Sequence, residues 1–184
     1  VVAAHDPNPI HEGKGVLALR RHGIHVDVGV LEKQAREQNE FFFKYIRDKT
    51  PFVTVKIAQS LDGKICTRTG NSRWISSPTS RAFVQGLRAE SDAILVGKRT
   101  LLADNPSLIP RTRIATNSGK PWRLVLNSDG HLGPKSKVLQ GKNLTIQVIS
   151  ERTLNSKRRA DQRASAIWLT VPEKKGRLDL SVLL

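Results

Sequence analysis

The chain has 184 residues, of which 38% are hydrophobic and 26% are charged, and its formal net charge is +15. This composition is typical of one folded domain, or of one domain and a remnant of another, and it excludes a disordered chain. The sequence has no apolar run near the roughly 20 residues of a membrane span, and its single cysteine, Cys66, excludes an intrachain disulfide and a cysteine-based zinc site.

Two absences set further expectations. The sequence contains no methionine, so we expect a processed product or a piece of a longer protein. Its N-terminus has no basic region followed by an apolar stretch, as a signal peptide would, and we predict a cytoplasmic protein. Cys66 is expected to be a small buried side chain rather than a reactive thiol.

The first 50 residues have the apolar spacing of a helix, a strand and a second helix. A short helix is predicted to end near Gly23, because glycine suits the position after a helix C-terminus. Every second residue from Ile24 to Val30 is apolar, which predicts a half-buried strand. Apolar residues at helical spacing predict a helix over residues 31–47.

The remaining sequence alternates between predicted strands and helices. Residues 52–58 are rich in β-branched residues and predict a central strand, on which Lys56 and Ala58 share one face. Ser77 followed by Pro78 indicates a helix N-terminus, and this helix extends to about Glu90. Further strands are predicted at residues 93–96, 123–126, 144–149 and 166–169. This alternation predicts an α/β fold with a largely parallel sheet.

Residues 56–111 contain five motifs in a specific order: KIAQSLDGK (56–64), GNSRWISS (70–77), LRA (87–89), DAILVG (92–97) and ADNPSL (103–108). This series resembles the reductase domain of the bifunctional riboflavin-biosynthesis deaminase/reductase, which has a dihydrofolate-reductase-like fold. Upstream, DPNP (6–9), GKG (13–15), HGI (22–24) and GVLE (29–32) resemble the C-terminal end of the deaminase domain of the same family.

The resemblance divides the chain into a deaminase remnant, residues 1–47, and the N-terminal part of a reductase domain, residues 48–184. The deaminase's zinc motifs, H-x-E and P-C-x-x-C, are absent from the sequence, so we expect no metal site. The family's Gly-rich helix entry, which holds the cofactor phosphates, is expected to lie beyond this sequence. We therefore expect weak NADPH binding and poor activity from the 184 residues alone.

The activity implied by the resemblance is the NADPH-dependent reduction of 5-amino-6-(5-phosphoribosylamino)uracil, with hydride transfer to C1′ of the ribosyl group. The family's catalytic positions match Lys56 and Asp104, its substrate-binding positions match Ser72, Arg88, Leu108 and Arg111, and its cofactor-binding positions match Ala58, Trp74, Thr100, Asp104 and Ser128. We expect Ser72, Trp74, Thr100, Asp104 and Arg111 to line one cleft at the C-terminal ends of the strands.

Each of these residues also has an ordinary structural explanation. Asp104 suits a helix end or a turn, each arginine suits a charged surface, and Trp74 suits a core. Two other functions remain open for the whole chain: a catalytically inert piece of the enzyme, and a basic module that binds nucleic acid. The net charge favours the nucleic-acid module, whereas the aromatic content of 5% and the absence of a nucleic-acid motif argue against it. The expected partners are the phosphorylated substrate and a second copy of the chain, because relatives associate through this domain.

Overall fold

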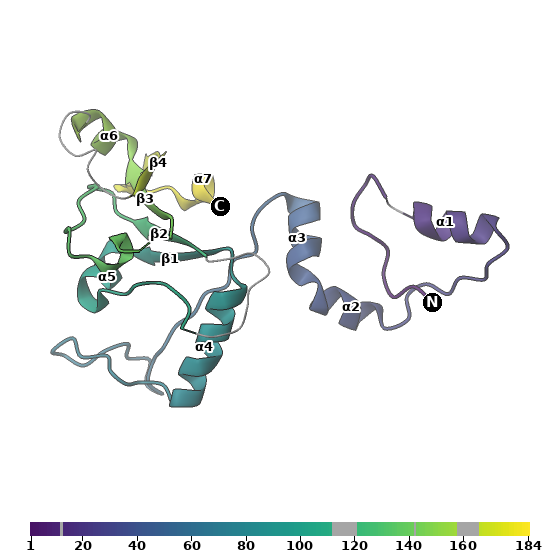
Figure 1. Cartoon of the computed structure of the whole chain (residues 1–184), viewed down its shortest axis with the longest axis horizontal. Helices are drawn as coiled ribbons and strands as arrows, with labels where there is room; N and C mark the ends of the chain where they lie inside the picture. Colours follow the sequence, from purple (N-terminus) through teal and green to yellow (C-terminus); the bar gives the residue numbers. More distant parts are fainter. Residues whose placement is uncertain (12, 112–120, 142, 158–165) are drawn as a thin grey trace. The chain divides into compact units, whose positions relative to one another are not determined.

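A computed structural model describes residues 1–11, 13–111, 121–141, 143–157 and 166–184 (Figure 1). The chain divides into two compact units. Unit 1 comprises Val1–Ile57 together with Leu184, and unit 2 comprises Ala58–Leu183. None of the helices in the described part of the chain has the length and apolar character that a membrane span requires.

Unit 1 contains three short helices, α1 (Lys14–Arg21), α2 (Glu32–Gln38) and α3 (Glu40–Asp48). The predicted helix ending near Gly23 is confirmed by α1. The helix predicted over residues 31–47 is interrupted at Asn39, whose φ is −113° and whose side-chain amide donates to Ala35 O at 2.8 Å. Asparagine competes with helical hydrogen bonding in this way, which explains why the segment forms two helices.

The strand predicted between Ile24 and Val30 is wrong. Within the described residues this segment makes only an isolated parallel bridge between Val2 and Val28, with Val2 N donating to Asp27 O at 2.8 Å and Gly29 N donating to Val2 O at 2.9 Å. Val26 is buried, whereas Ile24 and Val30 are about half exposed. The alternating pattern therefore buries Val26, but among the described residues it forms a single bridge and no ladder.

The central strand predicted over residues 52–58 is also wrong. The segment is not part of any sheet in the described chain, and Val53, Val55 and Ile57 are 51%, 75% and 65% exposed. The Phe52 ring packs edge-to-face on Phe41, with ring centroids 4.6 Å apart. Strand propensity describes how well a residue fits a half-buried pleated surface, and no strand of the described residues pairs with this segment to supply one.

Unit 2 is built on a parallel sheet of four strands in the order β1-β2-β3-β4, which confirms the predicted α/β fold. The strands are β1 (Ala93–Gly97), β2 (Trp122–Leu126), β3 (Thr145–Ser150) and β4 (Ile167–Val171). The other elements are α4 (Pro78–Glu90), α5 (Lys98–Asp104), the 3₁₀ helix η1 (Lys137–Leu139), α6 (Glu151–Lys157), the hairpin β5 (Glu173–Lys174) with β6 (Arg177–Leu178), and α7 (Leu180–Leu183).

The core of unit 2 lies against the middle of this sheet. All six residues of β3 are buried, and β2 buries Arg123 and Val125. Leu101 of α5, Leu108, Val125 and Val138 of η1 form a cluster in which none is more than 2% exposed. The cluster holds α5 and the loop that follows it against β2, and it thereby fixes the segments that carry several of the predicted site residues.

Helix α4 begins as its sequence predicts. Ser77 has extended backbone angles and its side chain accepts a hydrogen bond from Ser80 N at 3.1 Å, while Pro78 occupies the first helical position. A serine cap satisfies one of the free N–H groups at the helix start, and proline has no N–H to satisfy there. Ala89, at the other end of the helix, is buried.

Candidate functional site

Two predicted cofactor contacts, Thr100 and Ser128, follow the C-terminal ends of neighbouring parallel strands. The ends of the strands are paired in register, Gly97 of β1 with Leu126 of β2. Thr100 comes three residues after Gly97 and Ser128 two residues after Leu126, and both are exposed. Because β1 and β2 run in the same direction, both hydroxyl-bearing residues lie at the same edge of the sheet, where open α/β sheets bind their ligands.

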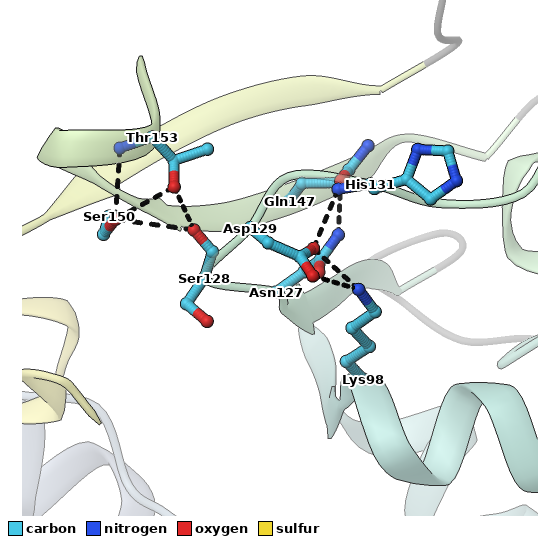
Figure 2. A network of polar contacts seen from close by, with 8 residues as sticks. All are labelled: Lys98, Asn127, Ser128, Asp129, His131, Gln147, Ser150 and Thr153. Atoms are coloured by element: carbon cyan, nitrogen blue, oxygen red, sulfur yellow. Dashed lines mark hydrogen bonds and ion pairs between the residues drawn. The ribbon is translucent and has the colours of Figure 1, made fainter. Parts of the chain in front are cut away.

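The turn that carries Ser128 is fixed by hydrogen bonds to its backbone (Figure 2). Ser128 O accepts from Thr153 Oγ1 at 2.5 Å and from Ser150 Oγ at 3.4 Å. Just before it, the buried Asn127 side chain donates to Gln147 Oε1 at 2.9 Å. Figure 2 shows the Ser128 hydroxyl directed away from Ser150 and Thr153. The hydroxyl is therefore presented at the edge of the sheet by a backbone that is held in place.

A glycine is required two residues further along the same turn. Gly130 has a φ of +65°, which strains any residue with a side chain, and an added Cβ would lie 3.2 Å from Thr153 Cγ2 and 3.6 Å from Ile149 Cγ2. The turn after β2 thus packs closely against β3 and the start of α6.

An ion pair joins the first residue of α5 to the turn after β2, and it was not predicted from the sequence. Lys98 Nζ donates to Asp129 Oδ1 at 2.7 Å and also contacts Oδ2, while His131 N donates to Oδ1 at 3.0 Å (Figure 2). The two side chains are 31 positions apart, so sequence spacing could not pair them. The Asp129-Gly130 dipeptide does indicate a turn, and this is the one feature that could have drawn attention to Asp129.

Asp104 is the last residue of α5 and is exposed. Asn105 follows it in the left-handed region, with φ 41°, and Asn105 Oδ1 accepts from Lys137 N at 2.8 Å. Within the described residues the Asp104 carboxylate makes neither a hydrogen bond nor an ion pair. A negative charge at a helix C-terminus is disfavoured by the helix dipole, so Asp104 does not stabilise α5. Its carboxylate is free to contact a ligand.

Two predicted substrate contacts, Arg88 and Arg111, lie near one another. Arg88 is half-buried near the end of α4, and its pKa is lowered by burial and by the positive charge of Arg111. Arg111 N donates to Gln85 Oε1 of the same helix at 2.9 Å. In the described part of the chain neither guanidinium group is paired with a carboxylate. Two neighbouring cations without a counter-charge form a site that suits an anion.

Leu108 contributes to the structure of this region through its buried side chain. It is 2% exposed in the cluster with Leu101, Val125 and Val138, and it has a left-handed φ of 55°. Such a conformation is strained for a leucine and persists here because the core holds the side chain. Any contact of Leu108 with a ligand would therefore have to come from its backbone.

Ser72 and Trp74 belong to an irregular segment before α4. Trp74 is 70% exposed and is not a core residue, and the Arg81 guanidinium carbon lies 4.3 Å from the centre of its ring. Arg81 Nη1 donates to Ser76 O at 2.5 Å, which fixes the cation over the indole. Ser72 is half-buried. An exposed indole with one supported face can stack against a planar ring.

The two remaining predicted positions lie where unit 1 ends and unit 2 begins along the sequence. Lys56 is an exposed residue of unit 1, and Ala58 is the first residue of unit 2. Since the predicted strand does not form, they do not share a strand face. The structure therefore groups the predicted residues in two places: Thr100 and Ser128 follow the ends of the first two strands, and Arg88 lies near Arg111. Asp104, at the far end of α5, belongs to neither group.

Other features of the described chain do not coincide with these residues. An open hollow of about 560 Å³ in unit 1 is lined by Val2, His5, His11, Val16, His22 and neighbouring residues, and includes no predicted site residue. The described residues contain no group of three or more His, Cys, Asp or Glu side chains that could hold a metal ion. Cys66 is exposed, so the expectation that it is buried is wrong.

Comparison with known proteins identifies relatives that cover both units. Residues 51–184 match the RibD C-terminal domain. Riboflavin biosynthesis protein RibD of Aquifex aeolicus (strain VF5) is 45% identical over 152 residues, which is 83% of this chain and 42% of the relative. RibD of Escherichia coli (strain K12) is 34% identical over 194 residues, covering 100% of this chain and 52% of the relative. The chain thus spans about half the length of these curated relatives.

Solved structures agree with the sequence comparison. Acinetobacter baumannii RibD (form 1) matches 95% of this chain and 48% of its own, with a TM-score of 0.74 and 32% sequence identity. The diaminohydroxyphosphoribosylaminopyrimidine deaminase/5-amino-6-(5-phosphoribosylamino)uracil reductase of Thermotoga maritima matches 91% of this chain and 52% of its own, with a TM-score of 0.72 and 32% identity. These likenesses confirm the fold that the motifs implied. With 134 of its residues, 51–184, matched to that domain, the chain belongs to the RibD C-terminal domain family.

Proposed function

We propose that this chain takes part in the reduction of 5-amino-6-(5-phosphoribosylamino)uracil to its ribitylamino form in riboflavin biosynthesis, with NADPH as the reductant. The observation that carries the proposal is the juxtaposition of Arg88 and Arg111 without a carboxylate partner in the described chain. Guanidinium groups donate two parallel hydrogen bonds to phosphate oxygens, so the pair suits the 5′-phosphate of such a substrate. Membership of the RibD C-terminal domain family supports the same reaction.

The residues at the edge of the sheet fit a nicotinamide dinucleotide. Thr100 and Ser128 offer exposed hydroxyl groups just after the paired C-terminal ends of β1 and β2. The exposed indole of Trp74 offers a flat apolar surface. Hydroxyls suit the ribose and phosphate oxygens of a dinucleotide, and an indole suits one of its rings. NADPH, when bound, supplies the hydride.

The reduction also requires a proton. When C1′ of the sugar gains hydride, its bond to the ring oxygen breaks, and that oxygen must be protonated to become a hydroxyl. We assign Asp104 to this region because its carboxylate is exposed and is not used to stabilise α5. A carboxyl group there orients sugar hydroxyls by accepting hydrogen bonds, or transfers a proton. Lys56 is the second catalytic candidate, with an ammonium group that donates to the sugar. Leu108 would contact the substrate through its backbone. Ser72 is the remaining proposed substrate contact, and Ala58 is the remaining proposed cofactor contact.

The test is NADPH oxidation by the natural protein in the presence of the phosphoribosylaminouracil substrate. We expect Arg88→Met and Arg111→Met each to raise the KM for substrate by about tenfold or more, since each removes a charge-assisted hydrogen bond. Asp104→Ala should abolish turnover without changing the affinity for phosphate. The control is Lys135→Met, which removes an exposed charge outside the site.

Three outcomes would contradict this proposal. Oxidation of NADPH that is unaffected by Asp104→Ala would end the role assigned to that carboxylate. A natural protein that binds the substrate and NADPH but never oxidises NADPH would support the alternative that the chain is a catalytically inert piece of the enzyme. Binding of nucleic acid in place of phosphorylated sugar would support the basic module.

Three further assignments belong to the proposal. We infer that residues 1–47 are the end of a deaminase domain and residues 48–184 part of the reductase domain, which the match beginning at residue 51 supports. We also infer a cytoplasmic, self-associating protein. Sedimentation of the natural protein tests association: a monomer at all concentrations would contradict it.

A further inference from the structure

Gln85 connects the two arginines of the proposed phosphate site. It lies on α4 three residues before Arg88, so the two side chains emerge from the same face of the helix. Gln85 Oε1 accepts a hydrogen bond of 2.9 Å from Arg111 N, across 26 positions of sequence. One face of α4 therefore carries Arg88 and, through Gln85, holds the backbone of Arg111. The Gln85 side chain is half-buried, while the hydrogen bond to Arg111 lies at the exposed surface of unit 2.

The loop that ends at Arg111 is also held at its other end and in its middle. Asn105 Oδ1 accepts from Lys137 N at 2.8 Å, and the Leu108 side chain is buried in the core. These two contacts fix residues 105–108 against η1 and β2. Among the described residues, the hydrogen bond with Gln85 then holds Arg111, three residues further on.

The electrostatics of the site explain why a neutral amide suits this position. Two guanidinium groups repel each other, and burial makes the charge of Arg88 more costly, as the lowered pKa of Arg88 reflects. A carboxylate would hold them together but would also neutralise the charge that attracts an anion. A glutamine oxygen accepts the backbone N–H of Arg111 and leaves both guanidinium groups available.

We propose that Gln85 is a positioning residue that holds Arg111 beside Arg88, so that the two guanidinium groups bind one phosphate monoester together. This inference rests on the proposed function for the identity of the substrate. It predicts that the effect of Gln85 depends on the phosphate of the ligand. A residue that merely stabilised the fold would affect phosphorylated and dephosphorylated ligands alike.

The experiment compares two substitutions of Gln85 in the natural protein. Gln85→Leu removes the acceptor, and we expect the KM for the phosphorylated substrate to rise about fivefold, as befits the loss of one neutral hydrogen bond, with kcat changed less than about twofold. The KM for the same substrate without its 5′-phosphate should not change. Gln85→Glu keeps an acceptor but adds a negative charge beside the arginines, so it should raise the KM for the phosphorylated substrate further and weaken competitive inhibition by inorganic phosphate.

The matched control is Gln34→Leu, an exposed glutamine on α2, which should leave both KM values unchanged. Equal increases of KM for the phosphorylated and dephosphorylated substrates in Gln85→Leu would overturn the positioning role, as would no increase at all. If Gln85→Leu fails to fold, the Gln85→Glu variant decides: unchanged phosphate inhibition would overturn the proposal.

A binding measurement separates this inference from the proposed reaction. Calorimetric titrations with ribose 5-phosphate and with ribose require no turnover. If the natural protein does not reduce the substrate, yet binds ribose 5-phosphate in a manner that Gln85→Leu weakens, the two-arginine site stands and the assigned reaction fails. If the natural protein reduces the substrate and Gln85→Leu weakens neither ligand, the reaction stands and the role of Gln85 fails.

Discussion

Strand β3 and the extended segment of residues 52–57 are both rich in β-branched residues, but they have opposite environments. In β3 all six residues are buried, and Ile149 is fully so. In the extended segment every residue is exposed, and Ile57 is 65% exposed. The chemical character of the two segments is nearly the same, so the difference arises from what lies beside each of them.

The neighbours of β3 are two parallel strands. It pairs with β2 on one side and β4 on the other, so its backbone donors and acceptors are satisfied in both directions. The segment of residues 52–57 has no pairing strand in the described chain. β-Branched side chains are therefore stabilised by the ladder and the packed faces around them, and only weakly by their own backbone preference.

The largest expected effect comes from truncating the same residue type in both segments. Ile149→Ala should lower the free energy of unfolding by about 2–5 kcal/mol, because it leaves a cavity in a packed core. Ile57→Ala should change it by less than about 0.5 kcal/mol, since that side chain is mostly in water. Urea unfolding followed by tryptophan fluorescence measures both, because Trp122 and Trp168 lie in the sheet. Equal losses in the two variants would show that residues 52–57 are packed in solution.

The parts of the fold that could be predicted from the sequence are those that depend on local interactions. The sequence predicts the first residue of α4 correctly. Ser77 caps the helix by a local hydrogen bond, and Pro78 suits the first helical position because it has no N–H to satisfy. The four strands of the sheet were found from their short apolar runs. Residues 24–30 and 52–58 have comparable patterns and failed, since a strand requires a partner that the pattern does not contain.

The candidate site divides in the same way. Motifs identified Arg88 and Arg111, and the structure brings them near one another. Sequence reasoning overlooked Gln85 and the Lys98–Asp129 ion pair, whose partners are 26 and 31 positions apart. Contacts of that separation depend on how the elements pack. Only the spacing of Gln85 and Arg88 on one helix face could have indicated that Gln85 belongs to the site.

An intermediate effect is expected for the buried polar pair between β3 and the turn after β2. Gln147→Leu should cost about 1–3 kcal/mol, because it leaves the Asn127 amide without its acceptor in a buried position. Among the described residues Asn127 Oδ1 has no hydrogen-bond partner, so Asn127→Leu removes one buried unsatisfied atom as well as one hydrogen bond.

The double variant sharpens this prediction. Gln147→Leu combined with Asn127→Leu should be destabilised by less than the sum of the single variants, because no half of the pair remains unsatisfied. Urea unfolding of all four proteins gives the coupling energy. Additive losses would show that each side chain is solvated independently, in contradiction to their burial.

The smallest effect is expected at the Lys98–Asp129 ion pair, which joins the start of α5 to the turn after β2. Its two side chains are 27% and 60% exposed, so water and salt screen the attraction. Lys98→Met should lower the free energy of unfolding by less than about 1 kcal/mol at about 0.01 M salt. At about 1 M salt, where the screening length is about 3 Å, the loss should disappear. Lys135→Met is the control, because it removes the same charge from a chain of net charge +15 at an exposed residue that forms no ion pair within the described residues. Removing a positive charge reduces the overall repulsion in both variants, so their difference isolates the pair. A loss in Lys98→Met that is equally large at both salt concentrations would mean that the lysine acts through the packing of its alkyl chain and not through Asp129.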